Sequence, residues 1–212
     1  MNARAFIESH LAVGHSVLTP EVPLYLATNL TPLWQATEDF MHQRNMAPPY
    51  WAFAWPGSEA LACFILSNPD LVAGRRVLDF AAGCGLAGIA AAMAGARQVE
   101  AVEIDPFAVT AIEMNAALNN VEITVTQADI VGRQGDWDVI LTGDVCYEQI
   151  MASRVMAWLE KQAECSIVLM ADPGRRYKPA QLGTKKAEYS VPTSLELEDS
   201  VCRTVIIYEI LA

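Results

Sequence analysis

Residues 76–88 read RVLDFAAGCGLAG, and this stretch decides the fold. Its first five residues predict a short apolar strand, and the alanine-rich run at residues 86–94 predicts a helix. Gly83, Gly85 and Gly88 form a Gly-x-Gly-x-x-Gly pattern at the junction, which permits a tight turn and a close backbone approach to a ligand. No Lys-Ser or Lys-Thr pair follows the glycines, so the stretch is not a P-loop.

Strands and helices alternate along the chain after this stretch. The expected strands cover residues 98–103, 122–126, 137–141 and 166–170, and the expected helices cover residues 106–118 and 149–162. Strands separated by helices of this length predict βαβ units and a parallel sheet. Residues 187–191 and 201–211 predict an antiparallel hairpin. The expected fold class is α/β, with a doubly wound sheet that is mostly parallel and ends in this C-terminal hairpin.

The first 48 residues differ from the rest and are expected to form a helical and extended segment ahead of a domain at residues 49–212. Residues 2–12 predict a short helix, and prolines then interrupt the pattern at Pro20, Pro23, Pro32, Pro48 and Pro49. The Pro-Pro-Tyr-Trp run at residues 48–51 predicts extended chain. A helix is expected from Ser58 to Leu66, with Ser58 as its N-cap.

The charge of the chain argues against two classes of partner. The 212 residues carry a formal net charge of -11, which disfavours binding to nucleic acid and docking on anionic lipid. Five of the 14 basic residues fall at residues 175–186, which form either a solvated loop or a contact for an acidic part of a protein substrate.

Composition and cysteine usage indicate a folded protein of the cytoplasm. Hydrophobic residues make up 53% of the chain and charged residues 18%, which excludes general disorder. The five cysteines are widely spaced and match no metal-binding pattern, so no metal site is expected. The start of the chain lacks the apolar core of a secretory signal, and no uncharged run predicts a membrane span.

Acidic residues follow three successive predicted strands, where ligands of such folds bind. Asp79 precedes Gly83 by four residues, where it would repel a pyrophosphate and attract an ammonium group; alternatively, it caps the following turn. Glu103 lies 18 residues beyond Gly85, a position that suits ribose hydroxyls; alternatively, it is a favourable charge at a helix start. Asp129 suits the amine of adenine or is a plain turn residue. Together the three acids describe S-adenosylmethionine and disfavour NAD.

These features resemble the class I methyltransferases, which use S-adenosylmethionine. The resemblance covers about residues 55–212 and rests on the stretch from Asp79 to Gly85, on Glu103 and on Asp129. It implies a Rossmann-like sheet of seven strands. Ala81 departs from the pattern, since many members have another glycine there, and this leaves the turn geometry open.

Two further motifs narrow the resemblance. Asp144 and Tyr147 form an Asp-x-x-Tyr motif after the fourth strand, and residues 50–57 read YWAFAWPG. Both are similar to motifs of the family 16, or seven-β-strand, protein lysine methyltransferases. With Gly143 and the DPGR run at residues 172–175, they most resemble the members that act on the β subunit of the electron transfer flavoprotein.

The resemblance implies a site with two parts. The expected cofactor contacts are Trp55, Asp79, Ala81, Gly83, Gly85, Glu103, Asp129, Ile130 and Gly143. Asp144 and Tyr147 are the expected catalytic residues and would face the methyl group and the incoming lysine, with Trp51 as a further substrate contact. The alternative for Trp51 and Trp55 is an aromatic core; their position among prolines favours a lid over the cofactor.

The implied reaction moves methyl groups from S-adenosyl-L-methionine to lysines of the flavoprotein β subunit, leaves S-adenosyl-L-homocysteine and modulates electron transfer. A lysine has a pKa of about 10.4, so forming its neutral amine at pH 7 costs about 4–5 kcal/mol. Asp144 is expected to orient the lysine first and to accept its proton second. The alternatives are a methyltransferase for another protein, such as a ribosomal protein, or for a small molecule, and a cofactor-binding module without turnover.

Overall fold

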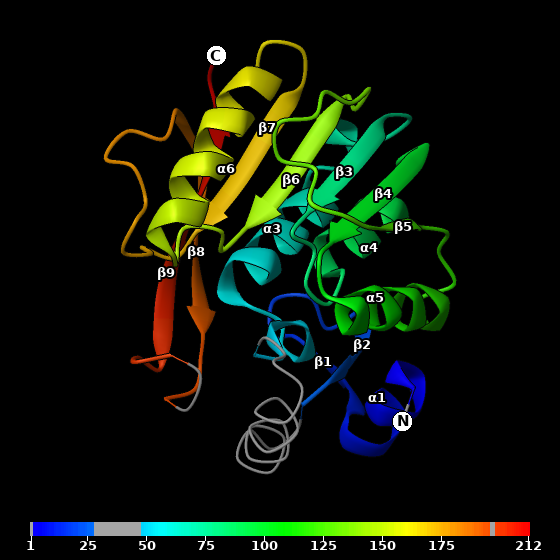
Figure 1. The fold of residues 1–212 in the computed structure, drawn as a ribbon. Helices are drawn as coiled ribbons and strands as arrows, with labels where there is room; N and C mark the ends of the chain where they lie inside the picture. Colours follow the sequence, from blue (N-terminus) through cyan, green and yellow to red (C-terminus); the bar gives the residue numbers. More distant parts are fainter. Residues whose placement is uncertain (1, 28–47, 196–197) are drawn as a thin grey trace.

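A computed structural model of the protein describes residues 2–27, 48–195 and 198–212. Its centre is a seven-stranded sheet with the strand order β5-β4-β3-β6-β7-β9-β8 (Figure 1). The strands are β3 (Arg76–Phe80), β4 (Gln98–Glu103), β5 (Thr124–Gln127), β6 (Val139–Gly143), β7 (Ile167–Asp172), β8 (Thr184–Pro192) and β9 (Cys202–Ile210). Neighbours from β5 to β7 pair in parallel, and β9 pairs antiparallel with β7 and β8. The predicted α/β class, with its antiparallel C-terminal hairpin, is confirmed.

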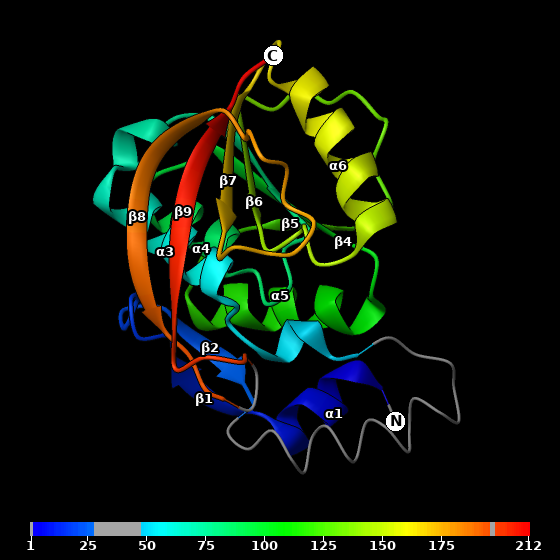
Figure 2. The same ribbon diagram turned by 90° about the vertical axis from the view of Figure 1, so that its left-hand side faces the viewer.

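Helices cover both faces of the sheet. They are α3 (Pro56–Ser67), α4 (Leu86–Met93), α5 (Pro106–Leu118) and α6 (Gln149–Gln162), with a short 3-10 helix, η2 (Pro69–Leu71), after α3. On β3, Val77 packs with Leu61 of α3, whereas the next residue, Leu78, packs in a second cluster with Trp158 of α6. Figure 2 shows α3 and α6 on opposite sides of the sheet. Strands β3, β6 and β7 are buried on both faces and therefore consist of nearly continuous apolar residues, which made them recognisable in the sequence.

The predicted bounds of β3, β4, α5 and α6 agree with the structure. At the start of α5, the carboxylate of Asp105 accepts a hydrogen bond from the Phe107 N–H at 2.8 Å, and Pro106 fills the first helical position. Strands β5 and β6 each begin two residues later than expected.

Two predictions for the segment before β3 are wrong. Tyr50–Ala52 forms a 3-10 helix, η1, where extended chain was expected. Helix α3 begins at Pro56, so Ser58 is not its N-cap; Trp55 holds that position without a side-chain hydrogen bond. Proline lacks the N–H that the first helical position would leave unbonded, and this favours Pro56 as the start.

The short helix predicted over residues 2–12 is present as α1 (Ala3–His10). After it come β1 (Ala12–His15) and β2 (Pro23–Leu26), which form a small antiparallel sheet that was not predicted. Phe6 and Ile7 of α1 pack in one apolar cluster with residues of α5, and Figure 1 shows α1 beside that helix. Pro32 lies outside the described residues. The domain boundary near residue 48 stays a prediction.

Asn115 of α5 connects the N-terminal sheet to the glycine turn after β3. Its Oδ1 accepts a hydrogen bond from the Tyr25 N–H at 2.7 Å, and its Nδ2 donates to the Cys84 carbonyl at 2.8 Å. One turn later, Asn119 donates to the Pro23 carbonyl at 2.7 Å. The Asn115 side chain is fully buried, and these bonds take the place of water for its amide.

Two kinds of feature are missing from the described ranges. None of their helices is both long and apolar enough to cross a membrane. They also contain no group of three or more His, Cys, Asp or Glu side chains that could hold a metal ion.

Candidate functional site

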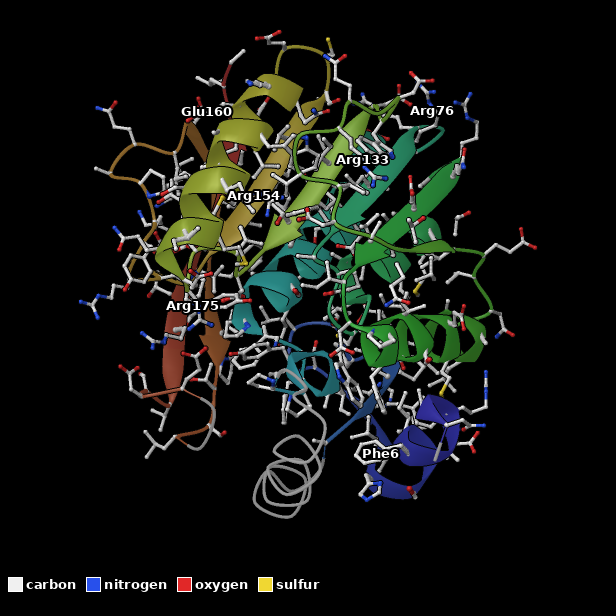
Figure 3. All side chains as sticks on the ribbon, viewed as in Figure 1. Phe6, Arg76, Arg133, Arg154, Glu160 and Arg175 are labelled. Atoms are coloured by element: carbon white, nitrogen blue, oxygen red, sulfur yellow. The ribbon has the colours of Figure 1, made fainter. Side chains whose placement is uncertain are left out.

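A cavity of about 470 Å³ lies at the carboxyl ends of β3, β4 and β6. Its walls are the turn after β3, residues 103–105 after β4, residues 143–145 after β6, and η1 with Trp55. Arg154 and Arg175 also border it; Figure 3 shows Arg154 on α6 and Arg175 near the lower end of that helix. Ligands of parallel α/β sheets bind at this position, and the volume is in the range of small-molecule sites.

The cavity brings most of the predicted site residues together. Those that border it are Trp51, Trp55, Ala81, Gly83, Glu103, Asp129, Gly143, Asp144 and Tyr147. Asp79, Gly85 and Ile130 do not border it. Ile130 is buried in the apolar cluster next to α6, and Gly85 is the left-handed N-cap of α4. The roles of all these residues stay predictions.

Asp79 is buried beneath the glycine turn. Its Oδ2 accepts a hydrogen bond from the Gly88 N–H at 2.7 Å, which joins β3 to the first turn of α4. A Cβ at Gly88 would lie 2.9 Å from the same oxygen, so a glycine is needed there. Burial raises the pKa of Asp79 to about 8. The carboxyl therefore caps the turn, which is the alternative that the sequence had left open.

The turn after β3 has left-handed backbone at Ala81, with a φ of 53°, and at Gly83, with a φ of 57°. An L-residue in this conformation costs roughly 1–2 kcal/mol, so Ala81 keeps the turn that a glycine makes more easily. Glu103 fixes the turn to the end of β4, because its carboxylate accepts from the N–H groups of Gly83 at 2.8 Å and Ile104 at 3.0 Å. Burial raises the pKa of Glu103, and these two hydrogen bonds lower it.

Asp129 is exposed at the far end of the cavity, where it pairs with Arg154 of α6 at 2.6 Å. Its carboxylate also accepts from the Val131 N–H at 3.0 Å. The hydrogen bond from Arg154 lowers the pKa of Asp129. Arg154 is a site residue that the sequence did not indicate, since an arginine on a helix surface carries no signal of its partner.

Asp144 is the most constrained acid of the site. Its Oδ2 accepts from the Gly57 N–H at 2.5 Å, and its Oδ1 accepts from Nε of Arg175 at 2.7 Å. Its backbone is left-handed, with a φ of 48°. Burial raises the pKa of Asp144 to about 6, and the charge of Arg175 opposes that rise.

Two glycines make this contact possible. A Cβ on Gly57 would collide with Oδ2 of Asp144, and a Cβ on Gly143 would lie 2.9 Å from the Ser58 nitrogen. The start of α3 therefore lies against the end of β6 with no room for side chains. Trp55-Pro56-Gly57 and Gly143-Asp144, which are separate motifs in the sequence, thus pack against each other in the structure.

Aromatic side chains form the rim of the cavity beside Asp144. The Tyr50 ring lies 5.6 Å from the Tyr147 ring and 5.8 Å from the Trp55 ring, measured between centroids. Trp55 donates from Nε1 to the Tyr50 carbonyl at 2.7 Å. Tyr50 and Tyr147 are 40% and 48% exposed, so they can meet a partner from solvent. Tyr50 was missed as a site residue, although it belongs to the YWAFAWPG motif.

Trp51 differs from the rim residues because it is only 4% exposed. Its ring stacks on Phe107 with the centroids 5.8 Å apart. It therefore belongs to the aromatic core, the alternative that the sequence left open, while one side of it borders the cavity.

Comparisons with known proteins agree with this arrangement. The family model for ribosomal protein L11 methyltransferase (PrmA) matches residues 61–167. The magnesium protoporphyrin IX methyltransferase of Synechocystis PCC 6803, solved with bound SAM, has a TM-score of 0.55 at 13% identity, over 84% of this chain and 96% of that chain. With its sheet order, glycine turn and site at the strand ends, this chain is a class I methyltransferase.

Sequence relatives define the family more closely. The chain belongs to the family of electron transfer flavoprotein β-subunit lysine methyltransferases. The Xenopus laevis member is 40% identical over 176 residues, which cover 81% of this chain and 70% of the relative. The human member is 36% identical over 217 residues, which cover 97% of this chain and 80% of the relative. The resemblance seen in the sequence motifs is confirmed.

Proposed function

We propose that this protein transfers methyl groups from S-adenosylmethionine to lysine side chains of the electron transfer flavoprotein β subunit. Its family supports both the reaction and the substrate. The observation that carries the proposal is the position of Asp144 and Tyr147, which border the same cavity as Glu103 and Asp129. A candidate lysine site and a candidate cofactor site thus share one space.

The side chains of the cavity fit the chemistry of S-adenosylmethionine. The molecule carries a sulfonium and an ammonium group, and the cavity wall carries four acids, Glu103, Asp105, Asp129 and Asp144. We assign the ribose hydroxyls to Glu103. We assign the adenine amine to Asp129, whose carboxylate is at the cavity edge, with Ile130 beside it in the chain.

The methionine part of the cofactor is assigned to the turn after β3. Ala81 and Gly83 would bring backbone groups close to it, and Gly143 and Trp55 would face it from the other walls. Gly85 would act from outside the cavity wall, where it forms the left-handed N-cap of α4. Asp79 lies beneath this turn and does not reach the cavity wall. We assign it to the ammonium group of the cofactor, which it would attract through the turn by its negative charge. A cation bound above the turn would favour the ionised form of Asp79 over the protonated form.

When bound, the cofactor supplies an activated methyl group on sulfur, which a neutral amine can attack directly. The protein must therefore place a lysine and remove its proton. We assign Asp144 to both tasks, orientation first, since an acid at the cavity wall attracts the lysine ammonium. Tyr50 and Tyr147 would flank the lysine stem, because exposed aromatic faces suit both an aliphatic chain and a cation. Holding the amine in line with the methyl group would supply much of the rate.

The substrate is tested with purified proteins. The protein is incubated with S-adenosylmethionine and purified electron transfer flavoprotein, and the intact mass of each subunit is measured. Additions of 14 Da per methyl group on the β subunit are expected, since each transfer replaces a hydrogen by a methyl group. An unchanged β subunit under conditions where another substrate is methylated would reject the proposed substrate.

A second candidate substrate is a ribosomal protein, which the match to the family model for ribosomal protein L11 methyltransferase favours. Transfer of a tritiated methyl group into a cell lysate separates the candidates by the size of the labelled band. A small-molecule substrate would leave the label in the unretained fraction. The expectations of a cytoplasmic location and of no nucleic-acid or membrane partner stay predictions. The net charge of -11 supports the second of them.

A further inference from the structure

Arg175, in the loop after β7, lies between two acids from distant parts of the chain. Its Nε and Nη2 contact Oδ1 of Asp144 at 2.7 and 2.6 Å. Its Nη1 and Nη2 donate to the two carboxylate oxygens of Glu198, at 3.0 and 2.6 Å. Glu198 lies in the connection between β8 and β9. One guanidinium therefore ties the end of β6 to the C-terminal hairpin.

This contact is shielded from water. The side chains of Arg175, Asp144 and Glu198 are 16%, 11% and 3% exposed. Ion pairs of this kind are less screened than exposed pairs, and removing one partner leaves a buried charge without compensation. Trp55 adds to the enclosure, since the guanidinium carbon lies 5.8 Å from its ring centroid.

Arg175 is the basic side chain paired with Asp144 within the described part of the chain. From α3 the Gly57 N–H donates to the Asp144 carboxylate, whereas the carboxylate of Glu59 accepts from the Leu18 N–H. Among the other titratable groups, Asp172 from β7 acts on Asp144, and Asp144 acts on Cys146 of its own loop. Lys178, from the loop after β7, acts on Cys146 and Asp172, and Glu198 lies behind Arg175. Asp172 disfavours the charge on Asp144, so the positive charge needed to keep Asp144 ionised comes from Arg175.

We propose that Arg175 is a positioning residue for methyl transfer: braced by Glu198, it keeps the Asp144 carboxylate ionised and aimed at the lysine site. The inference rests on the proposed function, because it gives Asp144 the lysine as its ligand. Arginine suits the task better than lysine, since its planar fork bonds two carboxylates at once while a lysine ammonium acts as a point charge. Arg175 acts through Asp144 and need not touch the substrate.

The test compares Arg175→Gln with the natural protein in kcat/KM for methylation of purified electron transfer flavoprotein, from about pH 6 to pH 9. The ratio of the two values cancels the titration of the lysine, which is the same for both enzymes. A neighbouring cation lowers a carboxyl pKa by about 1–3 units, so loss of Arg175 should lower the ratio about fivefold or more at pH 6 relative to pH 9. A purely structural role would lower the ratio equally at every pH.

Arg176→Gln is the matched control. It removes the same charge from the next position of the loop, where Arg176 is exposed and its guanidinium lies over the Tyr177 ring. We expect its ratio to be independent of pH. Arg175→Lys keeps the charge without the fork, so it should restore most of the pH profile while kcat stays severalfold low. Arg175→Met removes the charge and keeps an aliphatic stem, and it is the test variant if Arg175→Gln does not fold.

A second measurement separates this inference from the proposed function. The carboxyl carbon of Asp144 is followed by NMR during a pH titration of the free protein, without cofactor or substrate. An upward shift of about 1–3 units in the Asp144 pKa is expected in Arg175→Gln. A pKa that does not move, or a kcat/KM ratio that is flat with pH, would overturn the inference. Absence of flavoprotein methylation by the natural protein would instead count against the proposed function.

Discussion

Gly57 and Asp144 are 87 residues apart in the chain, and the Gly57 N–H donates to Oδ2 of Asp144 at 2.5 Å. The contact joins the first turn of α3 to the end of β6. It leaves no space for a side chain at position 57, since a Cβ there would meet the carboxylate of Asp144 and also lie 3.0 Å from the Ala171 carbonyl.

Gly57→Ala should therefore displace Asp144. We expect a loss of about 1–3 kcal/mol in the free energy of unfolding, because backbone on two sides cannot give way, and a loss of methyl transfer. Gly14→Ala is the control, since a Cβ there would meet only Leu26 at 3.9 Å. Urea unfolding and methyl-transfer rates measure both effects. Full activity of Gly57→Ala would show that the position of Asp144 is unimportant.

Asp144→Asn should remove methyl transfer and keep cofactor binding. Asparagine has the same shape and tolerates the left-handed backbone at this position, whereas alanine would add strain. We expect kcat to fall about 100-fold or more, as for loss of a general base. Calorimetry with S-adenosyl-L-homocysteine checks that the affinity is retained. A parallel loss of affinity would contradict the separation of the lysine site from the cofactor site.

Glu103→Gln should weaken cofactor binding. The carboxylate holds the Gly83 N–H and is assigned to the ribose, and a hydrogen bond to a charged group contributes about 1.5–3 kcal/mol. The Kd for S-adenosyl-L-homocysteine should therefore rise about tenfold or more. Glu100→Gln on the same strand is the control, because Glu100 bonds Thr126 and Trp137 away from the cavity. Equal effects of the two variants would count against the ribose assignment.

Ala81→Gly should stabilise the protein. Alanine at a φ of 53° costs roughly 1–2 kcal/mol, and the added freedom of glycine in the unfolded chain offsets about 0.5–1 kcal/mol of that gain. A net increase of up to about 1 kcal/mol in the free energy of unfolding is expected. Ala82→Gly, at the next position and without a positive φ, should destabilise instead. A loss of stability in Ala81→Gly would mean that the alanine is not strained.

Asp79 should make stability fall as the pH rises. Its pKa is about 8 in the folded protein, against an ordinary value of 3.8, so the folded state holds a proton that the unfolded state has lost between these values. The contribution of Asp79 to the free energy of unfolding is fully present below about pH 4 and is lost as the pH rises through about 8. Unfolding by urea across this range should show a weaker decline in Asp79→Asn. Identical slopes in the two proteins would mean that Asp79 is ionised when buried.

Much of the fold could be predicted because its signals are local. The apolar run of β3 and the Asp105-Pro106 start of α5 each mark an element without reference to the rest of the chain. Strands β1 and β2 carry no such signal, because β1 contains a glycine and β2 begins with a proline, and both residue types are depleted in strands. Asn115 and Asn119 bind β2 through side-chain hydrogen bonds; they lie about 90 residues further along and cannot be recognised as its partners from the sequence.

The acids of the candidate site were predictable, whereas the partners of its arginines were not. Arg175 stood out in the DPGR run and in the basic stretch at residues 175–186, but it pairs with Asp144 and Glu198 instead of forming a solvated loop. Glu103, Asp129 and Asp144 follow strands, and the ends of parallel strands meet at one edge of a sheet. Arg154 and Arg175 pair with two of these acids across 25 and 31 residues. Long side chains from a helix and a loop reach such partners only once the tertiary fold is set, so no spacing rule indicates them.

The hydrogen bonds of Asn115 have a consequence for anyone who shortens or fuses this protein at its beginning. A single amide holds Tyr25 on one side and the Cys84 carbonyl on the other. The small sheet of β1 and β2 thus supports, through Asn115, the turn that is assigned to the methyl donor. Removal of residues up to Tyr25 would leave the Asn115 amide without one of its two partners and would weaken its hold on the turn after β3.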